Sequence, residues 1–181
     1  MNAAYLCLAV SLCTLLGGCG GPEFSVPPTR AEGRCDAALV GTWQMPEKPD
    51  AGIRIDAQCR IHDRNGSNPW APSVHTAPSP RGGERLAWLQ TPPDEGGRWL
   101  LACYRVEGDR LRWGMIDPAE AERAVKSGAI RGQLPSGPYD GPGVLIIDQP
   151  IEAWPESLRN DACRPGTPEA SLVRVKQGDP P

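Results

Sequence analysis

Proline and glycine set the strongest limit on what this chain can fold into. Each occurs 21 times among 181 residues. Proline interrupts helices and central strands, and glycine favours turns. This content therefore predicts short elements joined by many turns and argues against long helices. A chain of this length forms one domain with a substantial core and is short for two.

Between the turns lie short segments that we expect to form strands, and one of them alternates apolar and polar residues with the period of two that is typical of a half-buried strand. In residues 53–61, every second side chain is apolar or is Cys59, so this cysteine is expected on the inward face. Gly108 predicts a short hairpin turn between two of the strands. The expected strands cover residues 38–45, 53–61, 85–91, 98–106, 110–116, 143–149 and 171–176.

Two short helices are expected among these strands. Asp117 can cap a helix, Pro118 suits its first position, and Gly128 can end it, which predicts a helix over 118–127. A second short helix is expected over 155–162. The chain is therefore predicted to be mainly β, with an antiparallel sheet or a barrel-like domain and one or two short helices.

The N-terminal segment has the pattern of an export signal. Residues 3–16 are apolar and uncharged, and the run is shorter than the roughly 20 residues that a membrane-spanning helix needs. The sequence LGGC at 16–19 resembles the lipobox of bacterial lipoproteins. This resemblance implies a cleaved signal peptide, residues 1–18, and a Cys19 that carries a diacylglyceryl group and an acyl chain such as palmitate. The alternative is an ordinary secretory signal with an unmodified Cys19.

The resemblance to lipoproteins also implies where the protein lives. Residue 20 is glycine and not aspartate, which in enterobacterial lipoproteins directs transport to the outer membrane. We expect a cell-envelope protein that is held at the outer membrane by its lipid and faces the periplasm. Residues 19–33 are expected to be the lipidated cysteine and a flexible tether of about 40 Å, followed by a β-rich domain over 34–177 and a tail at 178–181.

Four cysteines remain in the domain once the signal peptide is removed and Cys19 carries lipid: Cys35, Cys59, Cys103 and Cys163. An even number in an exported chain predicts two disulfides, and three pairings are possible. We favour Cys35–Cys163, which would tie the start of the domain to its end, and Cys59–Cys103, which would join two internal strands. No cysteine or histidine pair has the spacing typical of a zinc site.

Charge and motifs argue against several classes of function. The net charge is −3 with no basic cluster, so nucleic acid is not an expected partner. We find no nucleophile elbow and no phosphate-binding glycine loop, and we expect neither a catalytic residue nor a cofactor. His62, Asp63 and His75 could together hold a metal ion, but a site without metal is the favoured interpretation.

A second resemblance concerns the fold. Gly41 and Trp43 match the Gly-x-Trp that opens the first strand of lipocalin-like barrels. This resemblance implies sequential antiparallel strands and an Arg174 in the last strand that stacks on Trp43. The alternative is that Trp43 is an ordinary core residue.

Tryptophan is the most suggestive residue for binding, since there are six tryptophans and a single phenylalanine. The candidate ligand-binding residues are Trp70, Trp88, Tyr104 and Trp113. The first hypothesis is a non-catalytic lipoprotein that binds a small apolar ligand or an envelope component.

Two further hypotheses stay open. The protein could be an interaction module, such as an inhibitor or an envelope assembly factor, that uses the irregular stretches 63–83 and 132–143 to bind an envelope protein. It could also be an enzyme, which would need His62 or a carboxylate with a shifted pKa in a cleft. We favour binding over catalysis.

Overall fold

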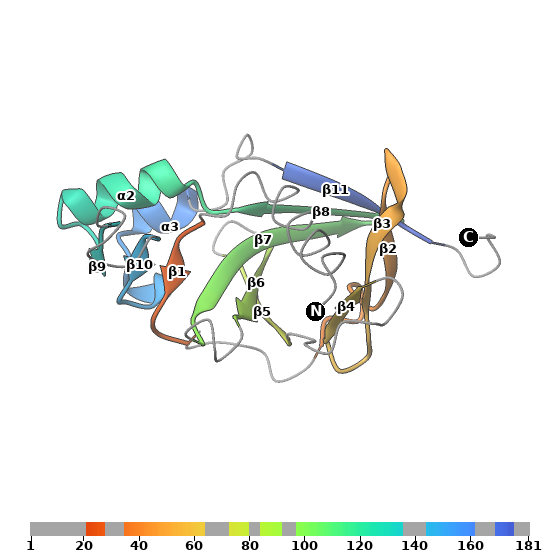
Figure 1. Cartoon of the computed structure of the whole chain (residues 1–181). Helices are drawn as coiled ribbons and strands as arrows, with labels where there is room; N and C mark the ends of the chain where they lie inside the picture. Colours follow the sequence, from red (N-terminus) through yellow and green to blue (C-terminus); the bar gives the residue numbers. More distant parts are fainter. Residues whose placement is uncertain are drawn as a thin grey trace, which may run out of the picture.

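The computed structural model describes residues 21–27, 35–63, 73–79, 84–91, 97–135, 144–161 and 169–175. It is mainly β, as predicted: a curved sheet with a helical layer at one end (Figure 1). The strands are β1 (Glu23–Phe24), β2 (Gly41–Met45), β3 (Lys48–Ile55), β4 (Ile61–Asp63), β5 (Val74–Pro78), β6 (Arg85–Gln90), β7 (Trp99–Glu107), β8 (Arg110–Met115), β9 (Gly132–Gln133), β10 (Ile146–Ile147) and β11 (Glu169–Arg174). The described helices are α2 (Pro118–Lys126), the 3₁₀ helix η2 (Ile151–Ala153) and α3 (Glu156–Asp161).

The main part of the sheet runs in the order β4-β3-β2-β11-β8-β7-β6-β5, and every neighbouring pair in it is antiparallel. Its two outer strands approach each other at a single bridge between Arg60 and Ser73, where the Val74 N–H donates to the Cys59 carbonyl at 2.8 Å. Because this contact is one bridge and not a ladder, the sheet is curved but is not closed into a barrel.

Strand β7 joins the curved sheet to a second, smaller group of strands. One edge of β7 pairs with β6, and the other pairs first with β1 and then with β8. Strand β1 also pairs in parallel with β10, which pairs with β9. This three-stranded ribbon lies beside α2 and α3 at the left of Figure 1.

Strand β1 corrects the expected domain boundary, because it lies inside the stretch 19–33 that the sequence assigns to a tether. Pro22 and Phe24 are fully buried. The segment is only two residues long in the ladder, and its partners lie on β7 and β10, more than 70 residues away in the chain. No local periodicity can reveal such a strand.

The sheet separates two apolar cores. The inner core lies on the concave side, because there the side chains of seven strands of the curved sheet come into contact. Its residues are Leu39, Trp43, Ile53, Ile55, Cys59, Val74, Ala87, Ala102, Tyr104, Leu111 and Leu172. The outer core lies between β5–β7 and the helical layer: Phe24, Ala77, Leu86, Trp88, Leu101, Cys103, Ile116, Ala121, Ala124, Ile130, Leu145, Ile147, Ile151 and Trp154. Strands β5 to β7 are therefore covered on both faces, and alternate residues contribute to different cores.

Several predicted elements are confirmed. Strands β6, β7 and β8 begin and end within one residue of the predicted ranges, and Gly108 forms the turn between the last two with φ of 59°. In α2, the Asp117 side chain accepts hydrogen bonds from the backbone N–H groups of Ala119 and Glu120, as expected of an N-cap. Helix α3 lies within the range predicted for it.

Five predicted elements are wrong in extent. The expected strand 53–61 is broken by a turn between β3 and β4, in which Cys59 has a positive φ of 59°. The expected loop 63–83 contains β5, and the expected loop 132–143 contains β9. The expected strand 38–45 begins only at Gly41, and the expected strand 143–149 is reduced to the two residues of β10. In the first case the break has a clear cause. The Asp56 carboxylate accepts hydrogen bonds from the backbone N–H groups of Gln58 and Arg60, and these bonds stabilise the turn.

The disulfide pairing also differs from our prediction. Cys35 is bonded to Cys59, so neither Cys35–Cys163 nor Cys59–Cys103 is formed. Cys59 faces inward as expected, but the turn before it brings it to the segment that precedes β2, 24 residues earlier in the chain. Cys103 is also disulfide-bonded. Cys163 lies outside the described residues.

We predict the complete pairing from these observations. Proteolysis without reduction is expected to release one linked pair of peptides that contains Cys35 and Cys59, and a second that contains Cys103 and Cys163, the fourth cysteine of the domain. Mass spectrometry of the digest before and after reduction measures both. A peptide that links Cys59 to Cys103 would contradict this assignment.

Candidate functional site

One end of the inner core is sealed by Trp43. This side chain is fully buried, and its indole N–H donates to the Leu39 carbonyl at 2.7 Å. Arg174 lies over the ring, 4.1 Å from its centroid, and its guanidinium donates to the carbonyls of Val40 and Ala38. The stacking expected from the sequence is therefore present, and it fixes the segment before β2 across this end of the sheet.

Gly41 is part of the same arrangement. Its φ is 146°, and a Cβ atom at this position would collide with the Arg174 guanidinium. A side chain here would push the arginine away from Trp43. The Gly-x-Trp pattern thus has a direct physical cause in this chain, since the glycine leaves room for the group that covers the tryptophan.

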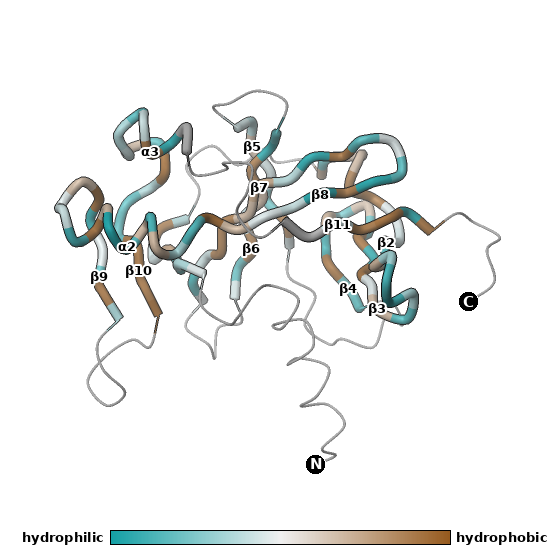
Figure 2. The backbone as a smooth tube through the Cα atoms, turned by 90° about the horizontal axis from the view of Figure 1, so that it is seen from above, coloured by the Kyte–Doolittle hydropathy of each residue, from teal (hydrophilic) through white to brown (hydrophobic). Residues whose placement is uncertain are grey.

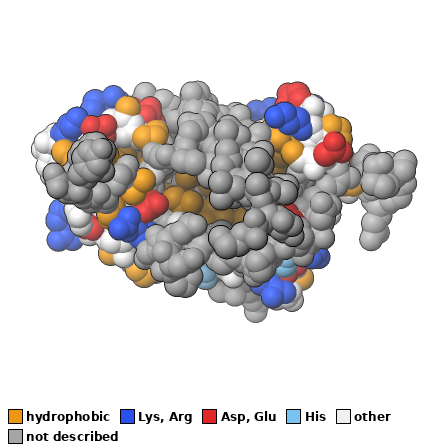
Figure 3. Space-filling model, in the orientation of Figure 1, with side chains coloured by type: hydrophobic (Ala, Val, Ile, Leu, Met, Phe, Trp, Pro, Cys, Tyr) orange, Lys and Arg blue, Asp and Glu red, His pale blue; other side chains and the backbone are white. Residues whose placement is uncertain are grey.

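At the other end of the inner core, partly buried side chains on β6 and β8 lie beside buried ones on β7. Tyr104 on β7 lies directly opposite Trp113 on β8, and Ala102 lies opposite Met115. Trp113, Met115 and Leu89 are only partly buried where they pack against the inner core. Figure 3 shows apolar side chains near the centre of the face turned to the viewer. We call the row Tyr104, Trp113, Met115 and Leu89, with Ala87 and Ala102 between them, the inner apolar row.

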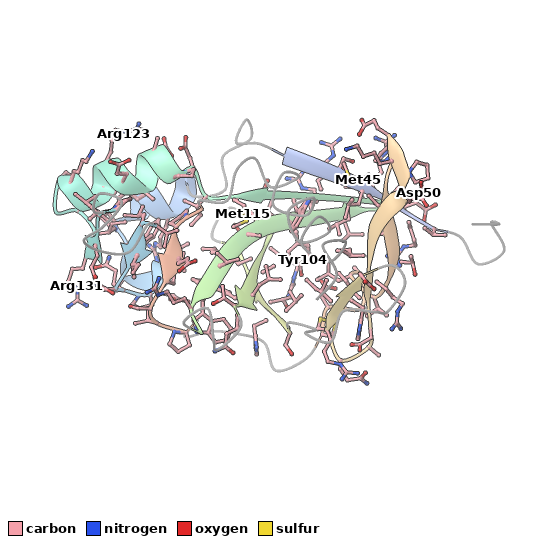
Figure 4. The ribbon with its side chains drawn as sticks, in the orientation of Figure 1. Met45, Asp50, Tyr104, Met115, Arg123 and Arg131 are labelled. Atoms are coloured by element: carbon pink, nitrogen blue, oxygen red, sulfur yellow. A yellow bond between two sulfur atoms is a disulfide. The ribbon has the colours of Figure 1, made fainter. Side chains whose placement is uncertain are left out.

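Small side chains mark the middle of this row. Ala87 and Ala102 are paired across β6 and β7, so neither strand places bulk at that point. Figure 4 shows Tyr104 near the centre of the molecule and Met115 between it and the helical layer. The labelled Met45 and Asp50 lie instead at the β2–β3 end. The row therefore combines aromatic and thioether groups with a floor of small residues, as apolar binding sites commonly do.

A polar network borders the inner apolar row at Tyr104. The phenol donates to the Asp36 carboxylate at 2.7 Å and accepts from the Arg85 Nε at 3.0 Å, and Arg85 also pairs with Asp36 at 3.2 Å. Burial, and then the hydrogen bond to the Asp36 carboxylate, raise the pKa of Tyr104 well above its ordinary value. The phenol is therefore neutral at physiological pH and serves as a fixed donor. Sequence reasoning missed Asp36 and Arg85, since no local motif surrounds either residue.

Trp113 carries an unpaired donor. Its indole N–H is buried and has no hydrogen-bond partner within the part of the chain that the structure describes. Leaving a buried donor unpaired costs about 1–3 kcal/mol. A ligand with an acceptor oxygen at this position would remove that cost.

The structure separates the four candidate ligand-binding residues. Tyr104 and Trp113 lie together on the inner face. Trp88 lies on the opposite face of β6, in the outer core, where its ring meets Phe24 edge-on at 4.8 Å between centroids. The structure therefore does not bring Trp88 together with Tyr104 and Trp113. Trp70 lies outside the described residues.

The candidate metal ligands do not come together. His62 Nε2 lies 2.9 Å from the Asp56 carboxylate, which also binds Arg60. His75 meets the Trp99 ring edge-on at 5.2 Å. Among the described residues, no three histidine, cysteine or acidic side chains are grouped in a way that could hold a metal ion.

Asp56 stabilises the turn that brings Cys59 to Cys35. Burial acts to raise its pKa, but hydrogen bonds from His62, Arg60 and Gln58 outweigh this and hold the pKa well below its usual range. The charged carboxylate therefore contributes stability above about pH 4, the ordinary range of an aspartate. That contribution is lost as the pH falls further, towards the lowered pKa of the folded state.

We predict that Asp56→Asn lowers the free energy of unfolding at pH 7 and makes its decline below about pH 4 shallower than in the wild type. Urea unfolding at a series of pH values measures both effects. Asp50→Asn, on the exposed part of β3, is the matched control for the loss of one carboxylate. Parallel pH profiles for wild type and Asp56→Asn would contradict the assigned role.

Comparisons with known proteins add no family to this description: no family model, no curated protein and no solved structure matches the chain. Within the described ranges, no helix has the length and apolar character needed to cross a membrane. The arrangement of residues is therefore the basis for assigning a function.

Proposed function

We propose that this protein is an exported, lipid-anchored binding protein of the cell envelope, which faces the periplasm and holds an apolar ligand along its inner apolar row. The observation that carries the proposal is the buried, unpaired Trp113 N–H among apolar side chains that are only partly covered. The aliphatic chain of a ligand would pack on the apolar side chains. An oxygen atom in its head group would accept a hydrogen bond from the Trp113 N–H. A fatty acid or a related single-chain lipid has this chemistry.

The geometry also supports binding over catalysis. The titratable groups beside the row are already engaged with each other, since Tyr104 donates to Asp36 and Arg85 pairs with both. Such a network orders the wall of a site and does not supply a free nucleophile or base. The interaction-module hypothesis for loops 63–83 and 132–143 stays a prediction, because 64–72, 80–83 and 136–143 lie outside the described residues.

A competition experiment tests the proposal. The chain from Gly20 onward, without its lipid, is titrated with Nile red, and bound dye is then displaced with palmitate. Trp113→Phe keeps an aromatic ring but removes the N–H, so palmitate is expected to bind roughly tenfold more weakly, which corresponds to one hydrogen bond. The matched control is Trp88→Phe, which makes the same change on the opposite face of the sheet and should leave the affinity unchanged.

Two results would contradict the proposal. One is a folded wild-type chain that neither enhances Nile red fluorescence nor releases the dye to palmitate. The other is an affinity that falls with Trp88→Phe and not with Trp113→Phe. Far-ultraviolet circular dichroism of each variant verifies that it is folded.

A further inference from the structure

The fold begins almost at the candidate lipidation site. Gly21 lies close to Met115, since a Cβ atom on Gly21 would be 3.2 Å from the Met115 Cε. Two residues later, the Glu23 N–H donates to the Leu145 carbonyl at 2.9 Å. Cys19 is two residues from Gly21, so the two Cα atoms are at most roughly 7 Å apart. A lipid on Cys19 would therefore be held beside the fold and not at the end of a long tether.

The ribbon of β1, β10 and β9 has an apolar end on that side. Its register pairs Glu23 with Ile146, and Ile146 with Gln133. One step further along the ribbon lie Pro22 and Leu145, which are both buried, and Leu134, which is exposed. Figure 2 shows apolar residues at the lower ends of β9 and β10. Leu134 is the one large apolar side chain among the described residues that is exposed, at 37 %.

The opposite end of the ribbon is polar. The Ser25 hydroxyl donates to the Asp148 carboxylate at 2.7 Å, and the Asp148 N–H donates to the Arg131 carbonyl at 3.0 Å. Both Ser25 and Arg131 are exposed. The ribbon therefore changes from polar to apolar along its length, and its apolar end is the one from which the chain continues toward Cys19.

We propose that the apolar end of this ribbon rests on the bilayer that holds the acyl chains of Cys19, with Leu134 entering the head-group region. This inference rests on the lipid anchor of the proposed function. An anchored lipid and an apolar side chain on the same side act together, because each adds apolar contact with the membrane. Met115 contacts Gly21 and belongs to the inner apolar row. The Met115 end of the row is thereby held beside the membrane, and a single-chain lipid would reach it from the bilayer.

Fluorescence quenching of the lipidated full-length protein tests this orientation. The protein carries an environment-sensitive dye on Leu134→Cys and is reconstituted in phosphatidylethanolamine and phosphatidylglycerol vesicles that contain a head-group nitroxide lipid. Arg131→Cys, three residues away and at the polar end of the same ribbon, is the matched control. We expect several-fold stronger quenching at 134 than at 131. Inserting about 15 Gly/Ser residues between Gly20 and Gly21, with an average span of about 20 Å, should largely abolish the difference.

Intact mass of the same preparation separates the possible failures. A chain without acyl groups would remove the anchor and with it part of the proposed function. An acylated chain with equal quenching at the two positions would overturn the orientation while leaving the anchor in place. Quenching at 134 that persists after the Gly/Ser insertion would also overturn the argument that the short connection sets the orientation.

Discussion

Trp43→Ala is expected to lower the free energy of unfolding by about 3–5 kcal/mol, the range found when a large buried aromatic side chain is truncated in a core. Three contacts are lost together. The ring is fully buried in the inner core, its N–H bonds the Leu39 carbonyl, and its face carries the Arg174 guanidinium. Since small domains are stable by only about 5–15 kcal/mol, this variant should lose a large fraction of its stability.

Urea unfolding followed by circular dichroism measures the effect, and Arg174→Lys is the informative comparison. Lysine keeps the charge but lacks the planar group that stacks on Trp43 and reaches two carbonyls. We expect a smaller loss, about 1–2 kcal/mol, for this variant. If Trp43→Ala lost no more than Arg174→Lys, the ring would not be the main element of this end of the core.

Phe24→Ala is expected to cost about 3–5 kcal/mol, although the sequence places this residue in a tether. The ring is fully buried in the outer core, 4.8 Å from the Trp88 ring and 6.0 Å from the Trp154 ring between centroids. Removing it would leave a cavity between β7 and the helical layer.

A truncated chain tests the role of β1 in stability in a second way. A chain that begins at residue 34 lacks β1, so β10 and the first residues of β7 lose the strand between them. We expect this chain to be less stable than one that begins at Gly20, by at least as much as Phe24→Ala. Ser25→Ala is the matched control, since Ser25 is exposed and its loss should change stability by less than about 1 kcal/mol. A tether would instead predict no effect from either Phe24→Ala or the truncation.

Much of the fold could be predicted because its signals are local. Strands β6 to β8 are continuous segments rich in apolar residues, and the turn at Gly108 follows from neighbouring residues. The N-cap at Asp117 is equally local. The site was predicted only in part. The predicted strands include Tyr104 and Trp113. They do not show which core the side chains on each face of the sheet belong to.

The errors concern contacts between distant parts of the chain. Trp88 was grouped with Tyr104, yet the two belong to opposite faces of one sheet, since both faces of β6 and β7 are covered. In a strand with two buried faces, periodicity alone does not distinguish the inner from the outer side. The predicted disulfide pairing was wrong for a related reason. The position of Cys59 is decided by the turn that the Asp56 carboxylate stabilises, and not by the strand pattern.

Local features of the sequence predict the fold class, the main hairpin and the capped helix, and the resemblance to lipocalin-like barrels at Gly41 and Trp43 implies the stacking of Arg174 on Trp43. Each of these depends on periodicity, turn chemistry or a short motif that neighbouring residues carry. Only the tertiary structure decided that Glu23–Phe24 is a strand, that Cys35 pairs with Cys59, and that the sheet divides two cores. These features depend on pairing and packing between residues far apart in the chain. The conformation of one segment is then decided by contacts with distant segments, which its own residues do not reveal.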